Sequence, residues 1–139
     1  MGLIKRNKNA QASMEYLMIL GFIAVIIIPL IMFFYFQSED YRESAIENQL
    51  YQIAQDIVVN VEKVYYYGEP SMVTMKFTLP DKVASAQVRD HEVLFLVQKR
   101  SGDSDVYETT EVNMTGSLPS TPGLHTITIE SRGSYVIIS

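Results

Sequence analysis

The sequence predicts an α+β protein in which a long N-terminal α-helix is followed by a small antiparallel β-sandwich head. An apolar run covers residues 16–36, and an apolar stripe with a helical period continues over residues 45–65. From Ser71 onward the hydrophobic period changes to two, which is typical of strands. The chain has 139 residues, which is enough for one modest domain with an extension.

The apolar run contains 21 consecutive residues without a charged or amide side chain. A helix of about 20 such residues spans the roughly 30 Å hydrocarbon core of a bilayer. A buried core helix is the alternative, but such a helix would normally be shorter and amphipathic. Lys5, Arg6 and Lys8 precede the run, so we expect the N-terminus in the cytoplasm and everything after Gln37 outside.

A cleavable secretory signal is a second alternative for this region. Such a signal has an apolar core of about 7–15 residues, followed by a cleavage site made of small residues. Here the core is longer and ends in bulky residues from Phe33 to Phe36, whereas the small residue Ala10 precedes it. Any cleavage is therefore expected on the cytoplasmic side, where it would leave the hydrophobic helix on the product.

The residues around Ala10 resemble the class III signal peptide of archaeal type IV pilins. Ala10 is followed by Gln-Ala-Ser-Met-Glu-Tyr-Leu, and the family pattern is Gln-x-Ser-x-Glu-Tyr/Phe just before a hydrophobic helix. Gln11, Ser13, Glu15 and Tyr16 match this pattern, and the one departure is Ala10, where the family has Gly. The resemblance implies that a membrane-embedded prepilin peptidase cleaves between Ala10 and Gln11. It also implies that a membrane platform and an assembly ATPase then build the subunits into a filament.

Glu15 is the single charged residue between Lys8 and Glu39. An acidic residue at the centre of a membrane helix costs about 2.5–3.5 kcal/mol, and less toward the interface. After cleavage, the new α-amino group of Gln11 would lie one turn from Glu15, and pairing with it, in the same chain or a neighbour, would relieve both charges. The alternative is that Glu15 complements the helix dipole in the first turn. Ser13 likewise has two interpretations, peptidase recognition or N-terminal capping.

The helical pattern continues beyond the membrane edge and ends at Gly68-Glu69-Pro70, so we expect one helix over residues 13–66. Its second half is amphipathic and should place an apolar stripe against the head. The predicted organisation is a leader (1–10), a transmembrane or filament-core helix (11–37), an amphipathic continuation (38–68) and an all-β head (69–139).

Six short strands are predicted in the head, separated by turn-forming residues. They cover residues 71–80, 83–89, 93–99, 106–114, 125–130 and 134–139. The segment from Asp103 to Asp105 slightly resembles a calcium loop, but it lacks the regular acidic positions and the closing Glu. We therefore interpret this segment as a solvated hairpin turn.

Nothing in the composition or the motifs indicates catalysis or metal binding. The chain has no cysteine, and His91 and His125 are too far apart in sequence for a metal-ligand spacing. No Gly-rich phosphate loop, nucleophile elbow or tuned carboxylate pair stands out. From residue 11 onward, eight Lys and Arg residues stand against 16 Asp and Glu residues, a net charge of −8 that disfavours nucleic acid. We expect no catalytic residue, no cofactor and no metal site, and hence no enzyme.

Asn113-Met-Thr115 is an N-glycosylation sequon in the part of the chain expected outside the membrane. Such tripeptides also arise by chance, so the sequence leaves the occupancy of Asn113 open. Surface glycans are common in the resembled family, which makes this asparagine a candidate site.

The resemblance implies a structural subunit of an archaeal type IV pilus-like surface filament. The precursor would reside in the cell membrane, and the assembled subunit would lie in an extracellular filament among identical or related pilins. The head would be exposed for adhesion to surfaces or cells. Three alternatives remain: a minor pilin or pseudopilin of a secretion or uptake machine, an uncleaved membrane-tethered extracellular binding module and, as the weakest of the three, an enzyme.

Overall fold

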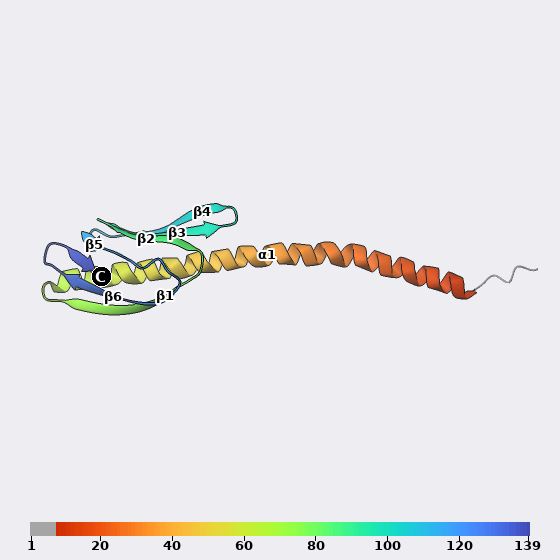
Figure 1. Cartoon of the computed structure of the whole chain (residues 1–139), viewed down its shortest axis with the longest axis horizontal. Coiled ribbons are helices and arrows are strands. Elements are labelled where there is room, and N and C mark those ends of the chain that lie inside the picture. Colours follow the sequence, from red (N-terminus) through yellow and green to blue (C-terminus); the bar gives the residue numbers. More distant parts are fainter. Residues whose placement is uncertain (1–7) are drawn as a thin grey trace, which may run out of the picture. The chain divides into compact units, whose positions relative to one another are not determined.

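The computed structural model describes the backbone of residues 8–139 and the side chains of residues 12–139. Its first element is helix α1 (Lys8–Tyr67), which confirms the long helix predicted from the sequence (Figure 1). The chain divides into two compact units, and the division falls within this helix, between Tyr41 and Arg42. The last seven turns of α1 therefore belong to the same unit as the strands.

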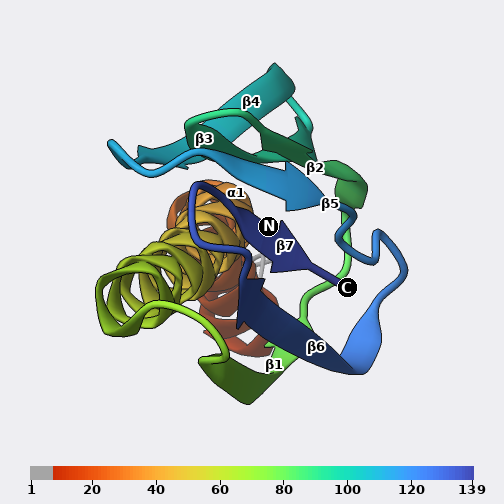
Figure 2. The same ribbon diagram turned by 90° about the vertical axis from the view of Figure 1, so that its left-hand side faces the viewer.

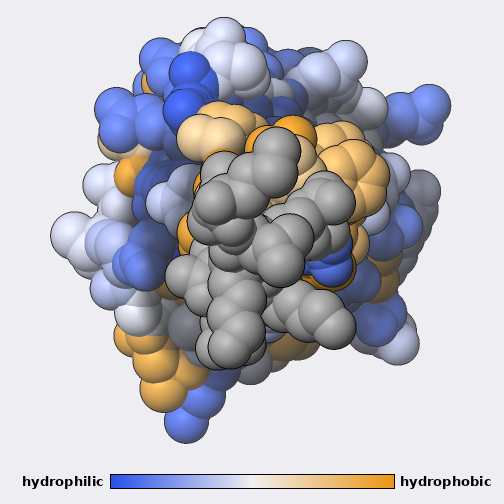
Figure 3. Space-filling view, turned by 90° about the vertical axis from the view of Figure 1, so that its right-hand side faces the viewer, coloured by the Kyte–Doolittle hydropathy of each residue, from blue (hydrophilic) through white to orange (hydrophobic). Residues whose placement is uncertain are grey.

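In the first unit, the described residues are all helical and their side chains are mostly exposed. Every side chain from Ala12 to Phe36 is exposed, apart from the half-buried Ala24. Pro29 lies inside α1 without ending it, although a proline removes one backbone donor. Figure 3, which faces the N-terminal end of the chain, shows hydrophobic side chains in orange on this side of the molecule.

Helix α1 ends at the predicted glycine. Gly68 has a φ of 71°, in the left-handed region, and its N–H donates to the carbonyl of Tyr65 at 3.1 Å. This closes the last turn in the manner of a C-terminal glycine cap. The next hydrogen bond, from the N–H of Ser71 to the carbonyl of Gly68 at 2.9 Å, reverses the chain into the first strand.

Seven strands follow the helix, one more than the sequence predicts. They are β1 (Met72–Leu79), β2 (Val83–Arg89), β3 (Glu92–Lys99), β4 (Gly102–Thr109), β5 (Met114–Gly116), β6 (Gly123–Ser131) and β7 (Val136–Ile138). The predicted strand over 106–114 is divided between β4 and β5. The turn predicted at Asp103–Asp105 is wrong, because both residues lie in β4 and the reversal occurs at Arg100–Ser101. Charged side chains are tolerated there because β4 is an edge strand whose outer face meets solvent.

The strands form two sheets, with the orders β1-β6-β7-β5 and β2-β3-β4. The α+β class predicted from the sequence is confirmed, but the first sheet is mixed. Strand β5 pairs in parallel with β7, whereas all the other strand pairs of the described structure are antiparallel. The β5–β7 pair departs from the purely antiparallel head that the alternating pattern suggested.

The second half of α1 lies between the two sheets and completes the core (Figure 2). One flank of the helix meets β1, where the side-chain amide of Gln49 donates to the carbonyl of Thr78 at 3.0 Å. The opposite flank meets β4, where the hydroxyl of Ser104 donates to Glu47 at 2.7 Å. Between these flanks, the predicted apolar stripe is buried at Leu50, Ile53, Ala54, Ile57, Val58, Val61 and Val64.

Gly116 should be the least replaceable glycine of the head. It has a φ of 138°, and an added Cβ would overlap the backbone carbonyl of Ile138 across the parallel β5–β7 pair. Gly102 has a similar φ of 126° but open space around it. A substitution at Gly102 therefore measures the cost of backbone strain without the cost of a steric overlap. We expect Gly102→Ala to cost about 1–3 kcal/mol and Gly116→Ala to cost clearly more. Urea unfolding of the full chain in detergent measures both, and equal losses would contradict the overlap argument.

Candidate functional site

The first candidate site is the exposed apolar surface of α1. Among the described residues, α1 is the one helix long and apolar enough to cross a membrane, and none of its most apolar window is buried. Individual side chains are open to the surroundings, for example Met18 at 73% and Phe22 at 69% exposure. Soluble monomers rarely expose a continuous apolar surface of this extent. The segment is therefore compatible with membrane anchoring.

Aromatic side chains gather at the C-terminal end of this apolar surface. Phe33, Phe34 and Tyr41 line a hollow together with the polar residues Gln37 and Ser38. The rings of Phe33 and Phe34 meet edge to face, with centroids 6.1 Å apart. Aromatic residues next to amides and hydroxyls suit the boundary between hydrocarbon and water. This arrangement agrees with a span that ends near Phe36.

The four residues predicted for processing and assembly lie in the first turns of α1. Ala10 and Gln11 belong to the helix, but their side chains lie outside the described residues, so cleavage and the pairing of the Gln11 amine remain predictions. Ser13 and Glu15 are exposed. Because the backbone is helical from Lys8 onward, positions 11 and 15 are one turn apart on the same face of α1.

Two glutamates that the sequence analysis did not single out attach α1 to the β2–β4 sheet. The Glu43 carboxylate accepts a hydrogen bond from the backbone N–H of Arg100 at 3.0 Å and pairs with the Lys82 ammonium at 3.5 Å. Glu47, one turn later, pairs with the Lys99 ammonium and accepts from Ser104. The spacing of four residues beside the apolar stripe was the available signal. The partners were not foreseeable because they come from residues far along the chain.

These contacts lower the pKa of both carboxyl groups. The Arg100 N–H is the main cause for Glu43, with help from the Lys82 charge. The hydrogen bond from Lys99 is the main cause for Glu47, followed by the one from Ser104. Each of these partners favours the ionised carboxylate, so both side chains stay charged well into mildly acidic solution.

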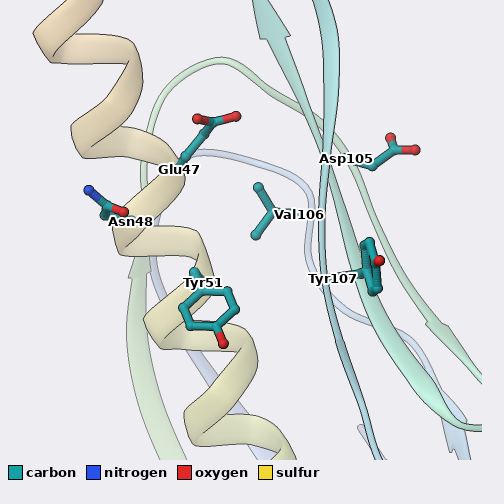
Figure 4. A pocket seen from close by; sticks show the side chains of 6 residues that line it. All are labelled: Glu47, Asn48, Tyr51, Asp105, Val106 and Tyr107. Carbon is teal, nitrogen blue, oxygen red and sulfur yellow. The ribbon is translucent and has the colours of Figure 1, made fainter.

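A hollow of about 260 Å³ opens between α1 and β4 next to Glu47. Figure 4 shows that Glu47 points from the helix toward the strand and that Val106 points back toward the helix, whereas Asp105 points away. Tyr51 and Tyr107 stand along the same hollow. The carboxylate of Glu47 is already paired with Lys99 and Ser104, so it is not available as a catalytic acid or base in this hollow. We interpret the hollow as the surface gap between α1 and β4.

The sequon residues are accessible. Asn113 and Thr115 are exposed while Met114 between them is buried, as expected for a chain entering strand β5. Asn113 borders a surface hollow of about 260 Å³ that Ser134 and Tyr135 also line. The exposed Asn113 side chain is open to a modifying enzyme, but its occupancy stays a prediction.

The two histidines have separate surroundings. His91 is exposed beside the β2–β3 turn, whereas the Nε2 atom of His125 lies 2.6 Å from the carbonyl of Thr121 and its ring centroid lies 6.1 Å from that of Phe77. Across the described part of the chain, no group of three or more His, Cys, Asp or Glu side chains is arranged to hold a metal ion.

The fold and these surfaces define a protein with an α+β head and an apolar helical segment suited to a membrane or to other helices. Comparisons with models of known protein families, with characterised proteins and with solved structures gave no significant match. The function therefore has to be inferred from the residues and their geometry.

Acid should weaken the attachment of α1 to the β2–β4 sheet. The pKa of Glu47 is lower in the folded state than its ordinary value, so its contribution is present above the unfolded pKa of about 4.3 and is lost as the pH falls through the folded pKa. We expect Glu47→Gln to reduce the free energy of unfolding at pH 7 by about 1 kcal/mol. The variant should also lose less stability than the wild type between pH 7 and pH 3.

Glu111→Gln is the matched control, because Glu111 is exposed and forms no ion pair with any of the described residues. Urea unfolding of the full chain in detergent, followed by near-ultraviolet circular dichroism of the tyrosines, measures the three proteins at each pH. An identical pH dependence for wild type and Glu47→Gln would contradict the assigned role.

Proposed function

We propose that this protein is a structural subunit of an archaeal type IV pilus-like surface filament. The observation that carries the proposal is the exposed apolar part of α1, which follows directly after the Gln-x-Ser-x-Glu-Tyr motif at Gln11–Tyr16. In the proposed sequence of events, a prepilin peptidase cuts before Gln11 at the cytoplasmic side. The apolar helix then leaves the lipid and packs among the same helices of neighbouring subunits.

Glu15 has a role in this proposal because apolar packing alone selects poorly between lipid and protein. When the helix exchanges lipid neighbours for protein neighbours, little apolar surface is removed from water. Close packing and polar contacts therefore decide the equilibrium between the subunit in the membrane and the subunit in the filament. A carboxylate inside a bundle of apolar helices requires a partner, and the α-amino group released at Gln11 is a cation on the same helical face. Pairing within or between subunits would both neutralise the carboxylate and fix the axial register.

The head of such a subunit would face the medium on the outside of the filament. Its net acidic surface suits a structural or adhesive part. The accessible Asn113 is a candidate for carrying a glycan there. Identical or related pilins, the peptidase, the assembly platform and its ATPase are the implied partners.

N-terminal sequencing and mass spectrometry of the native protein test the proposal directly. We expect filaments sheared from cells to contain this chain as a main component, beginning at Gln11. A processed chain found only in traces would favour a minor pilin or pseudopilin. An intact N-terminus at Met1 or Gly2, on protein that stays monomeric in the membrane, would refute the proposal and favour a tethered binding module.

Glu15→Gln should separate processing from assembly. The amide keeps the size of the side chain but removes the charge that would pair with the Gln11 amine, so we expect normal insertion and cleavage with a strong loss of sheared filaments. Glu39→Gln removes the next negative charge along the same helix and should leave the filament yield unchanged. Filament yields for Glu15→Gln equal to the wild type, in cells that make no other copy, would contradict the role.

A further inference from the structure

The outer face of the β2–β4 sheet carries hydrophobic side chains that the core does not use. In β3, Val93, Phe95 and Val97 are buried, whereas the alternating residues Leu94 and Leu96 point outward and are only partly buried. Across the β3–β4 ladder, Leu94 stands opposite Tyr107, which is 58% exposed, and Leu96 stands opposite Asp105. We call Leu94, Leu96, Asp105 and Tyr107 the leucine face.

The outer face of the other sheet has a different character. In β1, Val73 and Met75 pack toward the core, so the alternating residues Thr74, Lys76 and Thr78 point outward. Lys76 stands opposite Thr126 of β6, and two large apolar side chains, Met72 and Leu124, are 60% and 70% exposed on the same pair of strands. We call Thr74, Lys76, Thr78, Thr126, Met72 and Leu124 the lysine face.

The two faces have complementary charge. Most cations of the head are already used within the chain, because Lys82, Arg89, Lys99 and Arg132 form ion pairs. Lys76 forms no ion pair in the described structure and is surrounded by threonines. Asp105 also forms no ion pair within the described residues and is exposed beside two leucines. A chain that carries −8 from residue 11 onward repels its own copies, so a contact between copies needs a free cation opposite an acid.

The two faces also lie at the same level along α1. Gln49 donates to the carbonyl of Thr78, which is two residues from Lys76, and Glu47 accepts from Ser104, which is next to Asp105. Glu47 and Gln49 are only two residues apart, a rise of about 3 Å along the helix. The sheets enclose the helix from two sides, so their outer faces point in different directions away from the core (Figure 2).

We propose that the lysine face of one copy docks on the leucine face of the next copy, with Lys76 against Asp105. Leu124, which stands opposite Thr78 and thus one same-face position from Lys76, would then cover Leu94, which is one same-face position from Leu96 and Asp105. The surfaces differ and point in different directions, so the contact is heterologous and continues from copy to copy without closing into a dimer. This inference rests on the proposed function and adds the head-to-head contact between neighbouring subunits.

Exchanging the two charges tests the contact in the full chain, expressed in its host as the sole copy. Lys76→Asp and Asp105→Lys should each strongly reduce the yield of sheared filaments, and the double variant should restore it. Lys63→Asp makes the same charge change at an exposed helix position outside both faces and should leave the yield unchanged. Thermal unfolding in detergent checks that each variant keeps a folded head. A wild-type yield from Lys76→Asp, or a folded double variant without restored filaments, would overturn the contact.

Cross-linking tests the same contact by proximity. The chain has no cysteine, so a variant with Thr126→Cys, opposite Lys76, and Gln98→Cys, the next same-face position after Leu96, reacts with a short bis-maleimide only at these positions and keeps both charges. We expect a ladder of dimers, trimers and longer multimers from intact filaments, and no ladder from either single variant or from Lys63→Cys with Gln98→Cys. Filaments without the ladder would overturn this contact alone, whereas a wild-type chain that forms no filaments at all would overturn the proposed function with it.

Discussion

The burial of one face of α1 between two sheets is the interaction on which the head depends. Neither sheet covers the other completely, and the helix supplies the buried residues Leu50, Ile57, Val61 and Val64 among others. Each large aliphatic side chain contributes about 1.5–3 kcal/mol when it leaves water. The helix contribution is thus comparable with the net stability of a typical domain, about 5–15 kcal/mol. Strands β1–β7 would expose their inner faces to solvent without it.

The same helix has two kinds of surroundings along its length. From Arg42 onward its polar residues find partners within the chain, such as Glu43 with Lys82 and Glu62 with the Thr110 hydroxyl at 2.9 Å. From Ala12 to Phe36 the described side chains are almost all exposed and apolar. A continuous apolar surface of this kind requires lipid or other protein around it. The first half is therefore compatible with membrane anchoring, and the proposed assembly would surround it with the same helices of other subunits.

Features with a local periodicity could be predicted from the sequence. The helix, its buried stripe, its glycine cap at Gly68 and most strands follow from the spacing of apolar residues and from turn formers. The parallel β5–β7 pair could not be predicted, because three-residue strands have no clear period and their pairing is set by the rest of the sheet. Asp103 and Asp105 suggested a turn because acidic residues are rare in strands, but an edge strand exposes them.

The candidate site also has a part that could be predicted from the sequence and a part that could not. The motif from Gln11 to Tyr16 and the apolar run are local and can be recognised in the amino-acid sequence, whereas the contacts of Glu43 and Glu47 with the β2–β4 sheet join residues more than 35 positions apart, which no local pattern encodes.

The surfaces that distinguish one copy from the next also depend on long-range pairing. Strand β3 is a nearly continuous apolar run from Val93 to Val97, a pattern typical of a strand that is buried on both faces. The fold turns every second residue of this run, Leu94 and Leu96, outward. An outward leucine in a head with a net negative charge is a feature that folding of the single chain does not require. The proposed contact with a second copy would give those side chains an apolar partner, and Lys76 would give that contact a direction. In the proposed filament, the Glu15 pair would set the register of the apolar helices, and the contact between heads would add a second constraint on the order of subunits.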